Sequence, residues 1–203
     1  MTKAKIDLKV VLLGYASVGK TCIVTRYTSG QFGDTHTTIG GAFSSKRVVV
    51  GETEVLLGIW DTAGTERYQA VNVSYYRRAN AAIVCYDLTN RESWDKVTFW
   101  AEELTQNEPD IEIYIVGTKL DLIQQGDIKA VPEEEVKQTA RRYKAHIFET
   151  SSRTGENVSL LFQTIAEDFC KRTNNGTTPV NTNPSNVVNV NTQTQKKKSG
   201  GCC

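Results

Sequence analysis

A glycine-flanked run near the N-terminus, GYASVGKT at residues 14–21, ends in a lysine and a hydroxyl residue. It fits the pattern G-x-x-x-x-G-K-[ST], in which backbone N–H groups wrap a phosphate chain. Lys20 can reach the β- and γ-phosphates, and Thr21 offers a hydroxyl to Mg²⁺. An apolar run precedes the motif and a helical pattern follows it, as the motif requires. The stretch therefore predicts a phosphate-binding loop.

A carboxylate, Asp61, follows a second apolar run, EVLLGIW at residues 54–60. An aspartate after a strand is more often a turn residue. At the same sheet edge as a phosphate-binding loop it suits another role, which is to hold Mg²⁺ through water, since this ion keeps much of its hydration. We therefore assign Asp61 to the metal.

Two further loops carry residues that suit a purine base. Asp121 closes the segment GTKLD (117–121) and could accept hydrogen bonds from guanine N1–H and the 2-amino group. Adenine has neither donor and would leave this buried charge unpaired. Its expected position, one strand beyond the neighbour of the Asp61 strand, favours guanine. Backbone N–H groups of ETSSRTG (149–155) could bind guanine O6, although alone the segment is only a turn signature.

The composition of the 203 residues limits the class of protein. A hydrophobic content of 39% is enough for one well-cored domain. The net charge of +1 gives no global basic field that would point to nucleic acid. No apolar run approaches the ~20 residues that span a bilayer, and MTKAKIDLKV lacks a signal-peptide core. We expect synthesis and retention in the cytosol.

Three of the five cysteines, Cys22, Cys85 and Cys170, occur singly in apolar or helical contexts. No CxxC pair suggests zinc or a redox couple. We therefore expect these three to be small core residues.

The apolar patterns predict alternating strands and helices. Strands are expected at 8–13, 81–87, 111–117 and 145–151, and a hairpin from 42–50 and 55–60. Helices are expected from 20 to about 27, from 93 to 107, after Pro132 and over 158–169. This order implies an α/β fold: a mostly parallel six-stranded sheet with one antiparallel hairpin and helices on both faces. Ligands of such sheets bind at the carboxyl ends of the strands.

The composition changes sharply near Arg172. Residues 173–203 are rich in Asn, Thr and Gln and offer almost nothing to bury. Such a segment cannot offset the entropy cost of ordering, so we predict a domain over 1–172 and a disordered tail over 173–203.

These motifs together resemble the small Ras-like GTPases over residues 6–172, with TTIGGAF (37–43) as a further segment. TIG, WDTAG, ERY, YYR and the terminal CC resemble the Rab branch. The segments GIWDTAG and AAIVCYDLT, together with Thr118, resemble the atypical Rab twenty-four subgroup of the Rab branch. The resemblance implies a P-loop NTPase G domain that is monomeric, binds GTP or GDP with Mg²⁺ and hydrolyses GTP.

The resemblance assigns roles residue by residue. Thr38 caps the γ-phosphate and ligates Mg²⁺ with Thr21 and Asp61, while the Gly64 N–H contacts the γ-phosphate. Lys119 packs on base and sugar. Phe32 stacks on the base edge, although the segment from Phe32 to Thr38 is one residue short. The catalytic set is Lys20, Thr38, Gly64 and Thr65. The nucleotide-binding set is Gly14, Ala16, Ser17, Val18, Gly19, Lys20, Thr21, Cys22, Phe32, Thr38, Gly64, Thr118, Lys119, Asp121, Ser151, Ser152 and Arg153.

Three aromatic residues, Phe43, Trp60 and Tyr75, match the trio through which Rab proteins engage effectors. A second interpretation, that they are half-buried core residues, stays open.

Three positions depart from the family pattern. Thr65 replaces the glutamine that orients the attacking water, which predicts intrinsic hydrolysis slower by roughly 10²–10³-fold. Rab-type activating proteins supply an arginine and a glutamine in trans, so stimulated hydrolysis need not be lost. Thr118 replaces an asparagine that bonds the base and ties its loop to the P-loop, and we expect one or two lost hydrogen bonds and faster nucleotide release. Ala16 and Ser17 could crowd the γ-phosphate.

The chain ends in Cys202 and Cys203, which in Rab proteins both receive geranylgeranyl groups. Two chains give the stable anchoring that one does not, and 196–198 add positive charge for an anionic leaflet. Without the GTPase core, two exposed thiols would be the simpler interpretation. We expect localisation on the cytoplasmic face of an intracellular membrane, with a cytosolic pool.

The leading hypothesis is a prenylated GTP/GDP switch in vesicle and protein transport. Its expected partners are effectors, an exchange factor, an activating protein, and prenyl-transfer and Rab-extraction proteins, but no nucleic acid. The alternative is a guanine-nucleotide-binding scaffold that barely hydrolyses and is regulated by exchange. An ATP-dependent enzyme is a third hypothesis that rests on the P-loop alone.

Overall fold

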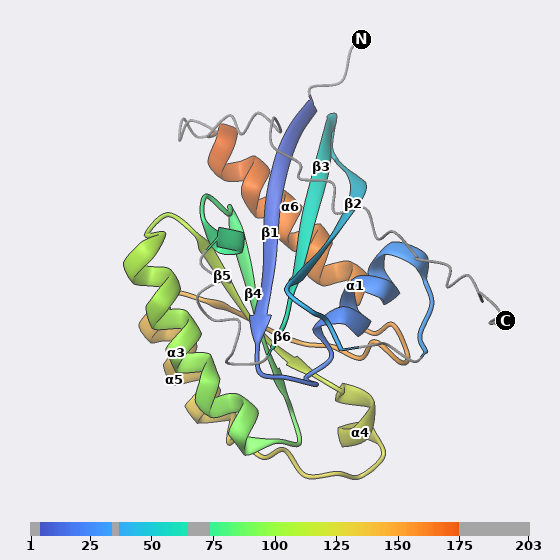
Figure 1. Cartoon of the computed structure of the whole chain (residues 1–203), viewed down its shortest axis with the longest axis vertical. Helices are drawn as coiled ribbons and strands as arrows, with labels where there is room; N and C mark the ends of the chain where they lie inside the picture. The colour runs from blue at the N-terminus through green and yellow to red at the C-terminus, as the bar shows by residue number, and fades with distance from the viewer. Residues whose placement is uncertain (1–4, 34–36, 65–73, 175–203) are drawn as a thin grey trace, which may run out of the picture.

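A sheet of six strands forms the centre of the molecule (Figure 1). The structure is a computed structural model that describes residues 5–33, 37–64 and 74–174. The strands are β1 (Lys5–Gly14), β2 (Gly41–Val50), β3 (Thr53–Thr62), β4 (Ala81–Asp87), β5 (Glu112–Thr118) and β6 (His146–Glu149). Their order in the sheet is β2-β3-β1-β4-β5-β6. Among the described strands, only β2 and β3 pair antiparallel, so the predicted sheet and hairpin are confirmed.

Helices cover both faces of this sheet, as expected (Figure 1). The helices are α1 (Lys20–Ser29), α3 (Arg91–Asn107), α4 (Leu120–Gln124), α5 (Glu133–Tyr143) and α6 (Val158–Asn174). Residues of α1 and α6 belong to one hydrophobic core, and residues of α3 and α5 belong to the other. The short α4 was not predicted, because five residues are too few to show a helical period. Helix α6 ends two residues beyond Arg172, where we expected the domain to end.

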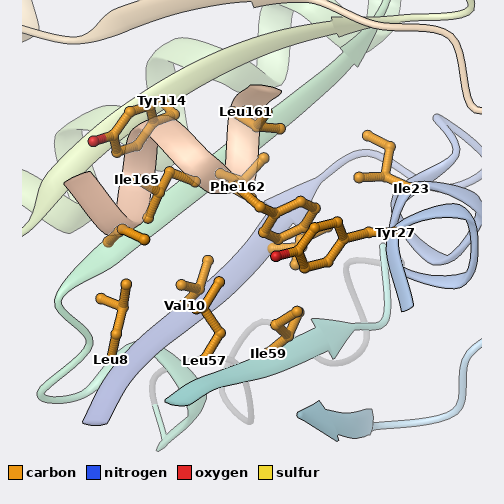
Figure 2. Packing of buried hydrophobic residues seen from close by; sticks show 14 of the residues in the cluster. Leu8, Val10, Ile23, Tyr27, Leu57, Ile59, Tyr114, Leu161, Phe162 and Ile165 are labelled. Carbon is orange, nitrogen blue, oxygen red and sulfur yellow. The ribbon is translucent and has the colours of Figure 1, made fainter. Parts of the chain in front are cut away.

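The α1–α6 core is closed by two aromatic rings. Tyr27 and Phe162 stack with centroids 3.9 Å apart and an interplanar angle of 14°, and Figure 2 shows the rings face to face. Apolar residues of β1 and β3, among them Val10 and Leu57, lie beneath them (Figure 2). This contact packs α1, which begins with Lys20 and Thr21 of the P-loop motif, against the sheet.

The three cysteines that we predicted to lie in the core differ in how deeply they are buried. Cys85 and Cys170 are buried, as expected, whereas Cys22 is only half-buried. The seven residues of β4 are all buried, because helices cover this central strand on both faces. None of the described helices is both long and apolar enough to cross a membrane.

The carboxyl ends of β1, β3, β4 and β5 carry Gly14, Asp61, Asp87 and Thr118 to one edge of the sheet. Because β1 and β4 both separate β3 from β5, Asp121 lies one strand further from Asp61 than we expected. The phosphate end and the base end of the predicted site therefore lie along a single sheet edge, at the ends of β1 and β5.

Candidate nucleotide site

A cavity of about 200 Å³ lies at the carboxyl end of β1. Its lining residues are Ala16, Ser17, Gly19, Lys20, Thr21, Cys22, Thr37, Thr38, Thr62 and Gly64. Most of them were predicted to bind the nucleotide. Thr37 and Thr62 were not, because the first neighbours Thr38 and the second lies inside a strand, where a threonine carries no distinguishing signal.

The P-loop backbone follows the path that its glycines allow. Gly14 has a φ of +137°, and a Cβ there would lie 2.2 Å from the carbonyl oxygen of Cys85. No residue with a side chain fits this approach. Ser17 adopts a φ of 61°, a left-handed conformation that is uncommon outside glycine and marks a sharply turned loop.

Lys20 is buried within this loop, with 5% of its surface exposed. Its Nζ donates hydrogen bonds to the carbonyl oxygens of Gly14 at 2.9 Å and Tyr15 at 2.8 Å. An ammonium has three donors, so one remains for an anionic ligand. Burial lowers the pKa of Lys20, while the negative charge of Asp61 opposes that shift. An anion bound in the cavity would stabilise the charged form.

The three predicted metal ligands converge on one point beside the cavity. Thr21 Oγ1 donates to Asp61 Oδ2 at 2.6 Å and lies 3.0 Å from Thr38 Oγ1. Thr38 Oγ1 in turn lies 3.4 Å from the same carboxylate oxygen. Three oxygen donors that close together form the ligand type and cluster that Mg²⁺ prefers.

Asp61 has an incomplete set of partners within the described part of the chain. It is 2% exposed, and its Oδ1 is buried without a hydrogen-bond partner there. Burial raises the pKa of Asp61, and the hydrogen bonds from Thr21 and Thr38 and the charge of Lys20 act in the opposite direction. A buried carboxylate oxygen without a partner is costly unless a cation or a bound water supplies one, so the residues fit a magnesium site.

Gly64 packs directly on the P-loop. A Cβ at this position would lie 2.5 Å from the Tyr15 carbonyl oxygen and 2.6 Å from the Ala16 nitrogen. Only glycine allows the chain after β3 to come this close to the phosphate-binding backbone. The arrangement suits the predicted contact of Gly64 with a γ-phosphate.

Thr118 retains the connection to the P-loop that we expected to be weakened. Its Oγ1 lies 2.6 Å from the Val18 carbonyl oxygen and 3.0 Å from the Tyr86 carbonyl oxygen, and the residue is 2% exposed. A threonine hydroxyl has one proton, and here it is directed to protein carbonyls. The expected weakening of the tie between the two loops is therefore not seen.

Lys119 forms an ion pair that the sequence did not reveal. Its Nζ lies 2.6 Å from Asp87 Oδ2. Although burial alone would raise the pKa of Asp87, hydrogen bonds from Lys119 and Thr89 together with the Lys119 charge hold it below its usual value. Asp87 is the polar end of the apolar run AAIVCYD, and that pattern could have identified it, as it did Asp61.

Asp121 is buried beside the loop that follows β6. Its Oδ1 accepts a hydrogen bond from Ser151 Oγ at 2.6 Å, and 8% of the residue is exposed. The structure therefore brings together the predicted guanine-reading carboxylate and the predicted O6-binding loop, whose members include Ser152 and Arg153. Phe32, by contrast, is 50% exposed, and no described aromatic ring packs on it.

The three predicted effector residues form one aromatic cluster. The ring centroids of Phe43 and Trp60 are 5.1 Å apart, and those of Trp60 and Tyr75 are 5.5 Å apart. Phe43 is 57% exposed, whereas Trp60 and Tyr75 are half-buried. A purely core role therefore does not describe Phe43. Thr65, Cys202 and Cys203 lie outside the described residues.

Comparisons with known proteins agree with this geometry. The Ras family matches residues 9–171. The chain is 97% identical to the Ras-related protein Rab-24 of Dictyostelium discoideum, over the full length of both. It is 45% identical over 165 residues to the Ras-like GTP-binding protein RYL2 of Yarrowia lipolytica, covering 78% of this chain and 79% of that protein. It is 44% identical to the GTP-binding protein ypt5 of Schizosaccharomyces pombe, covering 80% and 77%.

Proposed function

Because the chain belongs to the Ras family and, within it, to the small GTPases of the Rab group, we propose that it is a membrane-anchored GTP/GDP switch with slow intrinsic hydrolysis. The observation that carries this proposal is the convergence of Thr21, Thr38 and Asp61 beside the buried Lys20. This cluster offers oxygen ligands and a cation at the spot where a phosphate chain would end.

The phosphates bind to the loop between β1 and α1. Lys20 turns its free N–H toward the β- and γ-phosphates, and the backbone N–H groups that follow Gly14 surround them. Thr21, Thr38 and Asp61 hold Mg²⁺, which neutralises phosphate charge when it is bound. The hydroxyl of Thr38 already lies beside Asp61 and Thr21, so binding of the ion and a γ-phosphate would fix residues 37 and 38 in place.

The base binds at the other end of the sheet edge. Asp121 accepts the guanine N1–H and 2-amino donors, and Lys119 lies along base and sugar. Thr118 supports the loop through Val18 but has no second proton for the base. Guanine preference is therefore kept, while affinity for both GTP and GDP is lower than an asparagine would give.

Hydrolysis depends on a partner. Thr65 is too short to orient water as glutamine does, so the chain retains GTP unless an activating protein supplies that group. The bound GTP orders residues around Thr38 and Gly64, and the aromatic cluster of Phe43, Trp60 and Tyr75 presents the resulting state to effectors.

The C-terminal tail supplies the membrane anchor. We assign 1–172 to the G domain and 173–203 to the tail, with prenyl groups on Cys202 and Cys203. Prenyl-transfer and Rab-extraction proteins would act on this end, and an exchange factor would act on the nucleotide site. The anchored protein acts in vesicle and protein transport on the cytoplasmic face of an intracellular membrane.

Single-turnover hydrolysis of bound GTP tests this proposal. The unaltered chain should hydrolyse slowly, a Rab-type activating protein should accelerate the reaction, and Thr65→Gln should raise the intrinsic rate by roughly 10²-fold. Thr105→Val, on the exposed face of α3, is the control. Fast intrinsic turnover contradicts the role of Thr65. Absence of stimulation favours the alternative, a guanine-nucleotide-binding scaffold regulated by exchange.

A further inference from the structure

Arg26 joins two parts of the molecule that are far apart in the sequence. It lies in the last turn of α1, and its Nε donates to the Ser152 carbonyl oxygen at 2.7 Å. Its Nη2 donates to the Arg153 carbonyl, and its Nη1 donates to the Gly30 carbonyl at 2.6 Å. A planar guanidinium can serve three acceptors with one fixed geometry, which a lysine cannot do. Arg26 thus holds the loop after β6 against the end of α1.

In the loop after β6, two backbone N–H groups, those of Ser152 and Arg153, have no hydrogen-bond acceptor among the described residues. The N–H of Ser151 bonds to Glu156, that of Thr154 bonds to the Ser151 hydroxyl at 3.1 Å, and that of Gly155 bonds to the Ser151 carbonyl at 2.8 Å. Among the described residues, nothing accepts a hydrogen bond from the N–H of Ser152 or of Arg153. Ser152 is also buried, with 9% of its surface exposed. A buried backbone donor is normally satisfied, so a ligand acceptor fits at Ser152, and the N–H of the exposed Arg153 follows it in the same loop.

Arg26 sets the direction of one of these donors, the N–H of Arg153, and holds the loop that carries the other. The described peptide bonds are all trans, so the N–H of Arg153 is directed opposite to the Ser152 carbonyl in the same rigid plane. By fixing that carbonyl, the guanidinium fixes the N–H as well. The same loop is held next to the Asp121 carboxylate by the 2.6 Å hydrogen bond from Ser151. The free donors and the carboxylate therefore belong to one hydrogen-bonded unit.

We propose that Arg26 is a positioning residue for guanine recognition: it holds the loop of Ser152 and Arg153 in the position from which their free N–H groups face the O6 acceptor of the base. Arg26 itself does not touch the nucleotide. The proposal rests on the proposed binding of guanine nucleotides. It differs from a purely structural role, in which Arg26 would only cap the C-terminal end of α1, where a cation is favourable in any case.

The test compares two nucleotides that differ only at the atom in question. Full-length protein is loaded with GDP or with 6-thio-GDP, in which sulfur, a weak hydrogen-bond acceptor, replaces O6. The dissociation rate of each is measured by chase with excess GTP. The variants are Arg26→Met, which removes all three donated hydrogen bonds, and Arg26→Lys, which keeps the charge without the fork. Arg141→Met, on the exposed surface of α5, is the matched control.

We expect Arg26→Met to speed GDP release by about tenfold and 6-thio-GDP release by less than about twofold, because one or two hydrogen bonds to O6 are lost. Arg26→Lys should lie close to Arg26→Met, and Arg141→Met should match the unaltered chain. Equal acceleration for both nucleotides indicates a structural role and overturns the proposal. Unchanged GDP release, or an unaltered chain that does not distinguish the two nucleotides, overturns it as well.

If the proposed function itself is wrong, the result differs from the one expected when only the role of Arg26 is wrong. If the unaltered chain retains neither nucleotide, guanine-nucleotide binding itself is contradicted, and the proposal for Arg26 falls with it. Should Arg26→Met unfold, Arg26→Lys carries the same comparison. The thermal midpoint of each loaded variant shows whether release was measured on folded protein.

Discussion

The phosphate end and the base end of the site are held together in different ways. At the phosphate end, Lys20 and Asp61 are buried charges, and the Oδ1 of Asp61 has no partner among the described residues. At the base end, each polar side chain already has one: Thr118 with Val18, Lys119 with Asp87, and Asp121 with Ser151. The phosphate end therefore depends on its ligand to offset buried charge, whereas the base end is assembled in advance.

This difference explains why the base end tolerates a departure from the family pattern. The side chain at position 118 has a structural task, which is to hold the P-loop carbonyl of Val18, and, in the proposed function, a recognition task toward the base. A hydroxyl can perform the first task with its single proton and leaves the second undone. No such division is open to Lys20, whose charge performs both tasks.

Replacement of Lys20 is the most severe test of the difference between the phosphate end and the base end. Lys20→Met should weaken GTP and GDP binding by at least ~10³-fold, because it removes the charge that balances both the phosphates and Asp61. Equilibrium titration with a fluorescent GDP analogue measures the change. Lys137→Met on α5, an exposed lysine, is the control. A loss below about tenfold would show that the phosphate end does not dominate affinity.

Replacement of Thr118 tests the pre-assembled end. Thr118→Val keeps the shape and removes the hydroxyl, which leaves two buried carbonyls without this donor. We expect a loss of about 1–3 kcal/mol in the free energy of unfolding, measured by denaturant titration of the GDP-loaded protein. Thr105→Val is the control, since the Thr105 hydroxyl bonds only within its own helix. An unchanged stability would mean that the 2.6 Å contact with Val18 is not what ties the loops.

Most of the sheet could be predicted from the sequence, but the connections across the site could not. The run AAIVCYD identified β4 to the residue, because a strand buried on both faces is continuously apolar. The P-loop motif likewise identified Lys20 and Thr21. The Arg26 contacts with Ser152 and Arg153 could not be predicted, because an arginine on an amphipathic helix looks the same whether it faces water or a distant loop. The pairing of Lys119 with Asp87 required the strand order.

The smallest expected effect concerns the pH dependence of the base end. The pKa of Asp87 in the folded protein lies below its usual value near 3.8, so its ion pair stabilises the fold above that pH and loses this contribution as the pH falls through the lowered pKa. Asp87→Asn should lower stability at pH 7 by about 1 kcal/mol and flatten the decline below pH 4. Denaturant midpoints from pH 7 to pH 3 measure this. Asp127→Asn, exposed after α4, is the control, and an identical acid decline in Asp87→Asn would contradict the role of the pair.

The close approach at Gly14 differs from a second one, at Gly41, in whether a substitution elsewhere could relieve the clash of an added Cβ. A Cβ at Gly41 would meet the ring of Tyr75 at 2.8 Å, and a smaller residue at position 75 could make room for it. A Cβ at Gly14 would meet the backbone carbonyl of Cys85 at 2.2 Å, and a carbonyl is the same in every amino acid. Suppressor screens should therefore recover second-site revertants of Gly41→Ala at Tyr75, whereas Gly14→Ala should be restored only by reversion of codon 14 itself.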